Sequence, residues 1–90
     1  MKIVINKCFG GFSLSDTAVK ALHLDGPYAD IERTDAKLVR LVETDADAMS
    51  GHCAKLVVVE IPDTVTDWEL DEYDGAESIT YVVGGKIYHA

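Results

Sequence analysis

The last third of the chain carries two turn signals that determine how its strands can pair. The stretch DWELDEYDGAESITYVVGGKIYH, residues 67–89, places Asp74-Gly75 and Gly84-Gly85 between runs that alternate apolar and polar residues. Both dipeptides suit a two-residue type I′ turn, because both central positions of this turn need a positive φ. Together the two turns predict a three-stranded antiparallel meander.

The same turns predict the register of the meander. The expected cross-strand pairs are Tyr73 with Ala76, Glu72 with Glu77, Leu70 with Ile79 and Trp68 with Tyr81, then Val83 with Lys86, Val82 with Ile87 and Tyr81 with Tyr88. This register puts Trp68, Leu70, Ile79 and Tyr81 on one face, and a shift by one residue would separate them. The turns and the apolar pattern therefore favour the same meander.

Upstream of the meander, the pattern predicts a strand and a first helix. The run KIVIN, residues 2–6, is a short apolar strand. Ser15 is suited to be the N-cap of a helix, with Asp16 in its first turn. The dipeptide Gly26-Pro27 would end that helix, because proline cannot continue it.

A second helix and a second strand are expected in the middle of the chain. Thr34, helped by Asp35, would cap the helix, and Gly51 would end it in the left-handed conformation. The run AKLVVVEIP, residues 54–62, is the most apolar stretch of the sequence. It predicts a central strand that is buried on both faces and stopped by Pro62.

The order of these elements indicates the fold class. It is strand, helix, helix, strand, strand, strand, strand, or β-α-α-β-β-β-β. Two helices between the first two strands would return the chain to its starting end, so that neighbouring strands are antiparallel. The sequence thus predicts a single α+β domain over residues 1–90, with a mostly antiparallel sheet of about five strands and two helices on one face.

Composition restricts the class of protein. The chain has 90 residues, a net charge of −8 and two cysteines, which are too few for a secreted disulfide scaffold. We expect reduced thiols in a cytoplasmic protein, since there is no signal-peptide pattern and the longest apolar run, 56–59, is too short to span a bilayer. The acidic balance argues against direct nucleic-acid binding, which depends on Lys and Arg at phosphates.

The stretch KCFGGFSLSD, residues 7–16, raises the question of a phosphate-binding loop. No Lys-Ser/Thr follows Gly11, and the three-glycine spacing of a dinucleotide fingerprint is missing. Amides before the first helix could bind an anion weakly. The simpler interpretation is a tight turn that lets both Phe9 and Phe12 reach the core.

Cys8, His52 and Cys53 form a second candidate site. If the strands beside them are antiparallel neighbours, these side chains could approach each other and form a zinc site or a cysteine–histidine nucleophile. No Cys-x-x-Cys pair is present, so we interpret the thiols as buried or half-buried apolar groups. We predict no catalytic residue, no metal ligand and no cofactor.

Acidic residues are concentrated in the second half of the chain, where no Lys or Arg occurs from Leu56 to Gly85. The acids there are Glu60, Asp63, Asp67, Glu69, Asp71, Glu72, Asp74 and Glu77. One interpretation is a solvated edge that repels strand pairing. The other is a docking surface for a basic partner. The predicted partner-binding residues are Asp67, Glu69, Asp71, Glu72, Asp74 and Glu77.

Two stretches, MKIVINKCFGGFSLSD and EIPD…WELDEYDG, resemble the opening and the acidic hairpin of small proteins encoded by tailed bacteriophages and prophages. The resemblance covers residues 1–16 and about 60–75. It implies a phage origin and the cytoplasm of a bacterial host as the place of action, and it brings no catalytic residue. By analogy with small acidic phage proteins, it implies an anti-CRISPR or anti-restriction inhibitor of host defence.

The leading hypothesis is therefore a non-enzymatic protein-binding module that presents its acidic hairpin, as a DNA mimic, to a basic surface of a host nucleic-acid-binding complex. One alternative is a structural or assembly accessory protein of the virion. The other is a small metal- or thiol-dependent enzyme that uses Cys8, His52 and Cys53. A homodimer also stays open, because Val82 and Ile87, on the face opposite Tyr81, could meet either solvent or a second subunit.

Overall fold

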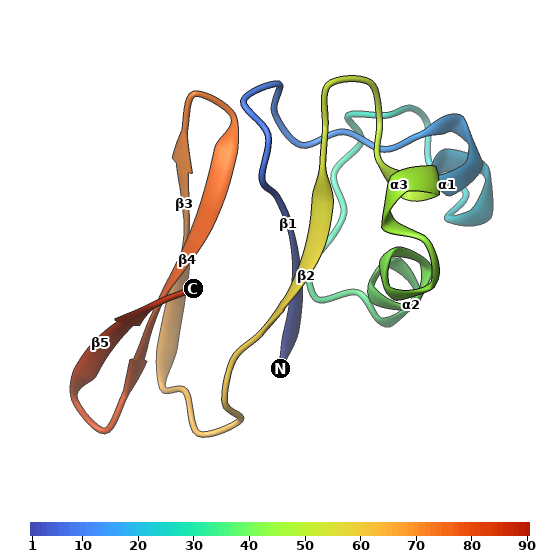
Figure 1. The fold of residues 1–90 in the computed structure, drawn as a ribbon. Coiled ribbons are helices and arrows are strands. Elements are labelled where there is room, and N and C mark those ends of the chain that lie inside the picture. Colours follow the sequence, from blue (N-terminus) through green and yellow to red (C-terminus); the bar gives the residue numbers. More distant parts are fainter.

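Five strands and three helices follow one another in the computed structural model, which describes residues 1–90 (Figure 1). They are β1 (Lys2–Asn6), α1 (Asp16–Ala21), α2 (Ala36–Thr44), α3 (Ala46–Met49), β2 (Leu56–Glu60), β3 (Asp67–Tyr73), β4 (Ala76–Val83) and β5 (Lys86–His89). The α+β class and the order of the strands are confirmed. The second predicted helix is divided into α2 and α3.

The strands form two antiparallel sheets, β1–β2 and β3–β4–β5. Figure 1 shows the helices on one side of β1–β2 and the three-stranded sheet on the other, so the β1–β2 pair is the middle layer. The division occurs because the chain turns away after β2, at Pro62, and begins a new sheet with β3. β2 is therefore hydrogen-bonded to β1 alone. The prediction that it is buried on both faces is wrong, since residues 57–59 are half-buried.

The meander β3–β5 has the predicted register at every pair. Its first turn has φ of 54° at Asp74 and 92° at Gly75, and its second has 56° at Gly84 and 80° at Gly85. Positive φ at both central positions is the mark of the type I′ turn, whose twist matches that of the strands it joins. Local turn chemistry therefore determines the pairing in this part of the molecule.

Two apolar cores lie on opposite sides of β1. The first lies between the β1–β2 pair and the helices and contains Val4, Leu14, Ala18, Leu38, Val39, Val42, Met49 and Leu56. The second lies between the two sheets and contains Ile3, Ile5, Ile61 and Ile79. β1 contributes to both, because successive side chains of a strand point to opposite faces.

The helix ends differ from the expected ones, except at Ser15, which caps α1 and accepts a hydrogen bond from the Ala18 N–H. Asp35, not Thr34, caps α2. Asp45 ends α2 and caps α3, and side chains of this kind compete with the helix for its own N–H groups.

Gly51, predicted to end the second helix in the left-handed conformation, does not have a positive φ. It is needed for a close approach, because a Cβ there would lie 2.3 Å from Ser13 Oγ.

The glycine-rich loop after β1 packs beneath other loops. A Cβ on Gly10 would lie 2.1 Å from the Cys53 carbonyl oxygen, and one on Gly75 would lie 2.5 Å from Gly11 N. The loop therefore packs closely against both the segment before β2 and the tip of the β3–β4 hairpin. Phe12 reaches the core, but Phe9 is 69% exposed, so the prediction that both rings are buried is wrong. The backbone at Phe9 contacts the hairpin tip instead.

Candidate functional site

The predicted partner-binding residues lie on the acidic hairpin, residues 67–77, which comprises β3, its turn and the start of β4. Asp67, Glu69 and Asp71 alternate along β3 on the face away from the second core, and all three are exposed. We call these three residues the acidic face. Glu72 and Asp74 continue the negative charge to the tip and are exposed as well.

None of these five carboxylates is in an ion pair. Two of them are oriented by uncharged donors. The Thr80 hydroxyl donates to Asp71 Oδ2 over 2.5 Å, and the Gly75 N–H donates to Glu72 Oε1 over 2.9 Å. The hairpin therefore keeps its negative charge uncompensated and holds part of it in fixed positions.

Glu77, the sixth predicted residue, does not belong to this surface. Its side chain is 5% exposed and forms a two-pronged ion pair, with Arg33 Nη1 at 2.6 Å from Oε1 and Nη2 at 2.9 Å from Oε2. The Asn6 N–H also donates to Oε1 over 2.7 Å. Glu77 faces β1 instead of solvent, so its proposed contact with a partner is wrong.

The opposed pair Glu72 and Glu77 shows how the hairpin avoids like-charge repulsion. Their Cα atoms are direct partners across the ladder, where two like charges would destabilise the pair. The two carboxylates go to different places, one to the turn amide of Gly75 and the other to Arg33. Each is satisfied locally, so neither depends on a partner protein.

Asn6 fastens the hairpin tip to the rest of the molecule. Its side-chain Nδ2 donates to the Gly75 carbonyl over 2.8 Å and to the Cys8 carbonyl over 2.6 Å. Its Oδ1 accepts from the N–H groups of Lys55 and Cys8. The residue has no exposed surface, and its bonds join the ends of both sheets.

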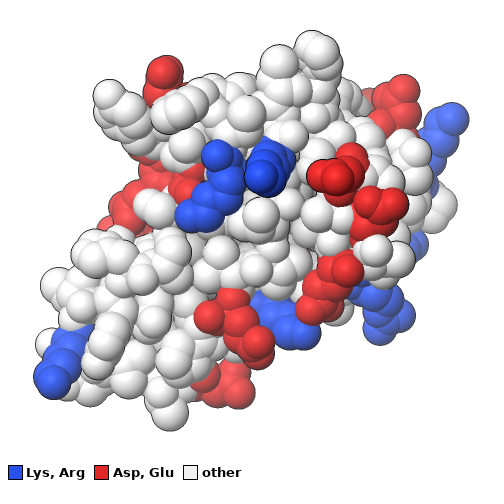
Figure 2. Space-filling view, in the orientation of Figure 1, with Lys and Arg blue, Asp and Glu red and all other residues white.

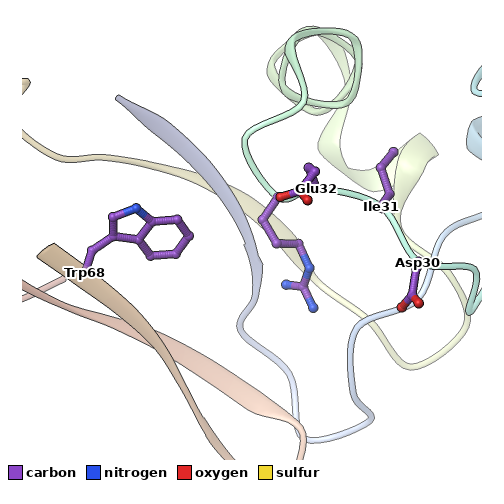
Figure 3. Close-up of a pocket in the computed structure, with 5 residues that line it drawn as sticks. Asp30, Ile31, Glu32 and Trp68 are labelled. Atoms are coloured by element: carbon purple, nitrogen blue, oxygen red, sulfur yellow. The ribbon is translucent and has the colours of Figure 1, made fainter.

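A groove on the inner side of the hairpin was not expected from the sequence. It is lined by Asp30, Ile31, Glu32, Arg33 and Trp68, and it has a volume of about 440 Å³. Figure 3 shows the indole directed from the meander toward the 30–32 segment. We call this hollow the Trp68 groove.

A smaller hollow adjoins the Trp68 groove. It has a volume of about 170 Å³, shares Asp30, Ile31 and Arg33 with the groove, and adds Phe12 and Tyr28. The Phe12 ring supports the Arg33 guanidinium, whose carbon lies 3.6 Å from the ring centroid. No sequence signal marked this site, because residues 28–33 form an irregular segment.

Cys8, His52 and Cys53 do not form the zinc site that the sequence allowed. β1 and β2 are antiparallel neighbours as assumed, but no three His, Cys, Asp or Glu side chains gather in an arrangement that could hold a metal ion. Cys8 is half-buried, as predicted, whereas Cys53 is exposed, contrary to the prediction. Cys53 takes a left-handed φ of 66° in the loop before β2.

Figure 2 shows how charge is distributed on the side of the molecule seen in Figure 1. The area over β4 and β5 is largely uncharged, and acidic side chains appear near the β3–β4 tip.

Two pKa shifts occur, both near the N-terminal end of β1. Glu43 raises the pKa of Lys2 by accepting its hydrogen bond, and the amino terminus lowers the pKa of Asp63.

Comparison with protein families, with curated proteins and with solved structures gives no match. None of the three helices has the length and apolar character that a membrane crossing requires. The site must therefore be interpreted from its own chemistry.

Proposed function

We propose that this protein is a non-enzymatic binding module whose acidic face docks onto a basic surface of a partner protein. The observation that carries the proposal is a row of exposed carboxylates on β3 and its turn without any cation partner inside the molecule. No Lys or Arg occurs from residue 56 to residue 85 that could neutralise them locally.

The geometry of a strand suits such a surface. Side chains on one face of a strand recur about every 6–7 Å, so the acidic face presents three charges in a line on a hydrogen-bonded frame. Uncompensated charge of one sign raises the rate of association with an oppositely charged surface and sets its orientation. The same field is screened by salt, because the Debye length is about 8 Å at physiological ionic strength.

The partner class that fits this chemistry is a nucleic-acid-binding protein, whose basic groove normally takes phosphates. A protein with a net charge of −8 would compete with nucleic acid for that groove instead of binding nucleic acid itself. The resemblance to small phage proteins favours a host defence complex of the CRISPR or restriction type as the target. The proposed activity is then inhibition by occupation of the groove.

The test is binding to candidate nucleases and CRISPR effector complexes across a salt series, with and without a competing oligonucleotide. We expect Glu69→Lys with Asp71→Lys to weaken binding at least tenfold and to reduce its dependence on salt. The matched control is Asp25→Lys with Asp47→Lys, which changes the net charge equally at two exposed acids outside the hairpin. Binding that ignores salt, or that both double variants weaken alike, would refute the proposal.

A further inference from the structure

β3 has one edge without a partner strand. It is hydrogen-bonded to β4 alone. The two-residue turn makes Tyr73 and Ala76 a hydrogen-bonded pair, and in an antiparallel ladder such pairs alternate. The N–H and C=O groups of Trp68, Leu70 and Glu72 therefore point away from β4. No backbone hydrogen bond outside the ladders involves them.

The Trp68 groove lies along the inner side of this edge and is negatively charged. Arg33 contributes little free charge, because both its terminal nitrogens bond the Glu77 carboxylate. Asp30 and Glu32 are exposed and have no ion-pair partner. An indole with two unpaired carboxylates opposite it is a favourable environment for a cation.

The far wall of the groove offers backbone groups as well. Asp30 and Ile31 belong to no helix or strand, and their N–H and C=O groups form no hydrogen bond to backbone or side chain. Backbone N–H and C=O groups on this segment and on the free edge of β3 thus both lack hydrogen-bond partners within the molecule. The groove between them, about 440 Å³, falls in the size range of ligand sites in proteins.

Negative charge lies on both sides of the same strand. The acidic face is on the outer side of β3, while Trp68, Asp30 and Glu32 are on the inner side. A helix laid against the protein would contact one of these sides. An extended chain beside β3 would contact both, because its successive side chains point to opposite faces.

We propose that an extended basic segment of the partner adds to the free edge of β3 as a fourth strand of the meander. One row of its side chains meets the acidic face, and an Arg or Lys of the other row enters the Trp68 groove. Main-chain hydrogen bonds to Trp68, Leu70 and Glu72 supply the register, and the two negative sides select basic side chains. This inference rests on the proposed function and names the kind of segment that the hairpin recognises.

The experiment uses the only tryptophan of the chain, Trp68, as its own reporter. The probe is a synthetic peptide that alternates arginine and threonine except at its centre, where one threonine is replaced by arginine so that both rows carry a basic side chain; it is titrated while indole fluorescence is recorded. Two further peptides carry N-methyl groups on alternate amides, one on the row of arginines and the other on the row of threonines with its central arginine. Strand addition predicts that one of these two sets lowers the affinity at least tenfold and that the other leaves it nearly unchanged.

The protein variants test the groove separately. Asp30→Asn with Glu32→Gln should weaken peptide binding about tenfold, whereas Asp25→Asn with Asp47→Asn, at exposed acids elsewhere, should not. Equal effects of both N-methyl sets, or no effect of the groove variant, would overturn the inference. If Glu69→Lys with Asp71→Lys abolishes partner binding and Asp30→Asn with Glu32→Gln does not, the proposed function stands and strand addition is refuted. A dimer of the protein that the peptide fails to dissociate would overturn it too, by assigning the edge to a second copy.

Discussion

The Arg33–Glu77 pair leads to a quantitative prediction about stability. Replacing Glu77 with alanine removes both carboxylate acceptors of the Arg33 guanidinium, whose side chain is only 21% exposed, and leaves it the Val4 carbonyl at 3.4 Å as its acceptor. It also leaves the N–H of Asn6, a residue with no exposed surface, without its acceptor. The variant thus has an unpaired, largely buried cation and an orphaned backbone donor at the point where the two sheets meet.

The expected loss follows from the cost of separating such a pair. Removing one partner of a buried ion pair destabilises a protein by about 3–5 kcal/mol, and an unsatisfied buried N–H costs about 1–3 kcal/mol. The two costs overlap at the same carboxylate, so we expect about 3–5 kcal/mol in total. A chain of 90 residues has a free energy of unfolding of about 5–13 kcal/mol. Glu77→Ala therefore removes a large part of it.

Urea unfolding followed by the fluorescence of Trp68 measures this loss. With an m value of about 1.5 kcal/mol per molar, the midpoint should fall by about 2 M or more. Glu72→Ala is the matched control, because Glu72 is the direct cross-strand partner of Glu77 and is exposed. It should cost less than about 1 kcal/mol. If the two variants differ by less than about 0.5 kcal/mol, the assignment of Glu77 to a structural role is refuted.

Two further predictions concern the hairpin tip and the N-terminal end of β1. Gly75→Ala should destabilise by about 2 kcal/mol or more, because the new Cβ would lie 2.5 Å from backbone atoms of the 9–11 loop at a φ of 92°. Gly84→Ala is the control, because a Cβ there would have nothing within 4 Å, and it should cost only about 1 kcal/mol. Thermal melts of both variants measure the two losses, and equal losses would contradict the packing of the tip. The second prediction concerns alkaline pH. Glu43 raises the pKa of Lys2 above 10.5, so the stability from this pair is complete below pH 10.5 and is lost as pH rises through the raised pKa. Glu43→Gln should lower stability at neutral pH by the small amount typical of an exposed pair and should match the parent above the raised pKa in urea titrations, so that its alkaline decline is flatter; an equal difference between the two proteins at neutral and at strongly alkaline pH would disprove the linkage.

The parts of the fold that depend on neighbouring residues were predictable from the sequence. The turns at Asp74-Gly75 and Gly84-Gly85 determined a register that the structure reproduces pair by pair. Ser15 as a helix cap follows from the same kind of local chemistry. Such signals are reliable because the hydrogen bonds involved join residues only a few positions apart.

Contacts between distant segments were not predictable. Arg33 and Glu77 are 44 positions apart, and nothing in their surroundings marks one as the partner of the other. The sequence shows that the hairpin is rich in acidic residues. Only the structure shows that Glu77 is buried and Glu72 exposed, since the two are cross-strand partners on the same face of the hairpin. The Trp68 groove has the same origin, because it arises where an irregular segment happens to face a strand edge.

The place of β1 between the two cores has a consequence for the order in which the chain folds. The turns of the meander close over two residues each, whereas the bond from Asn6 to Glu77 spans 71 positions and that from Met1 to Ile61 spans 60. Closing such long loops carries the larger entropic cost and slows folding. We therefore expect the strand that joins both cores to be fixed last. Until then Ile3, Ile5 and Ile79 would be uncovered, and we expect the chain to be most prone to aggregate in this interval.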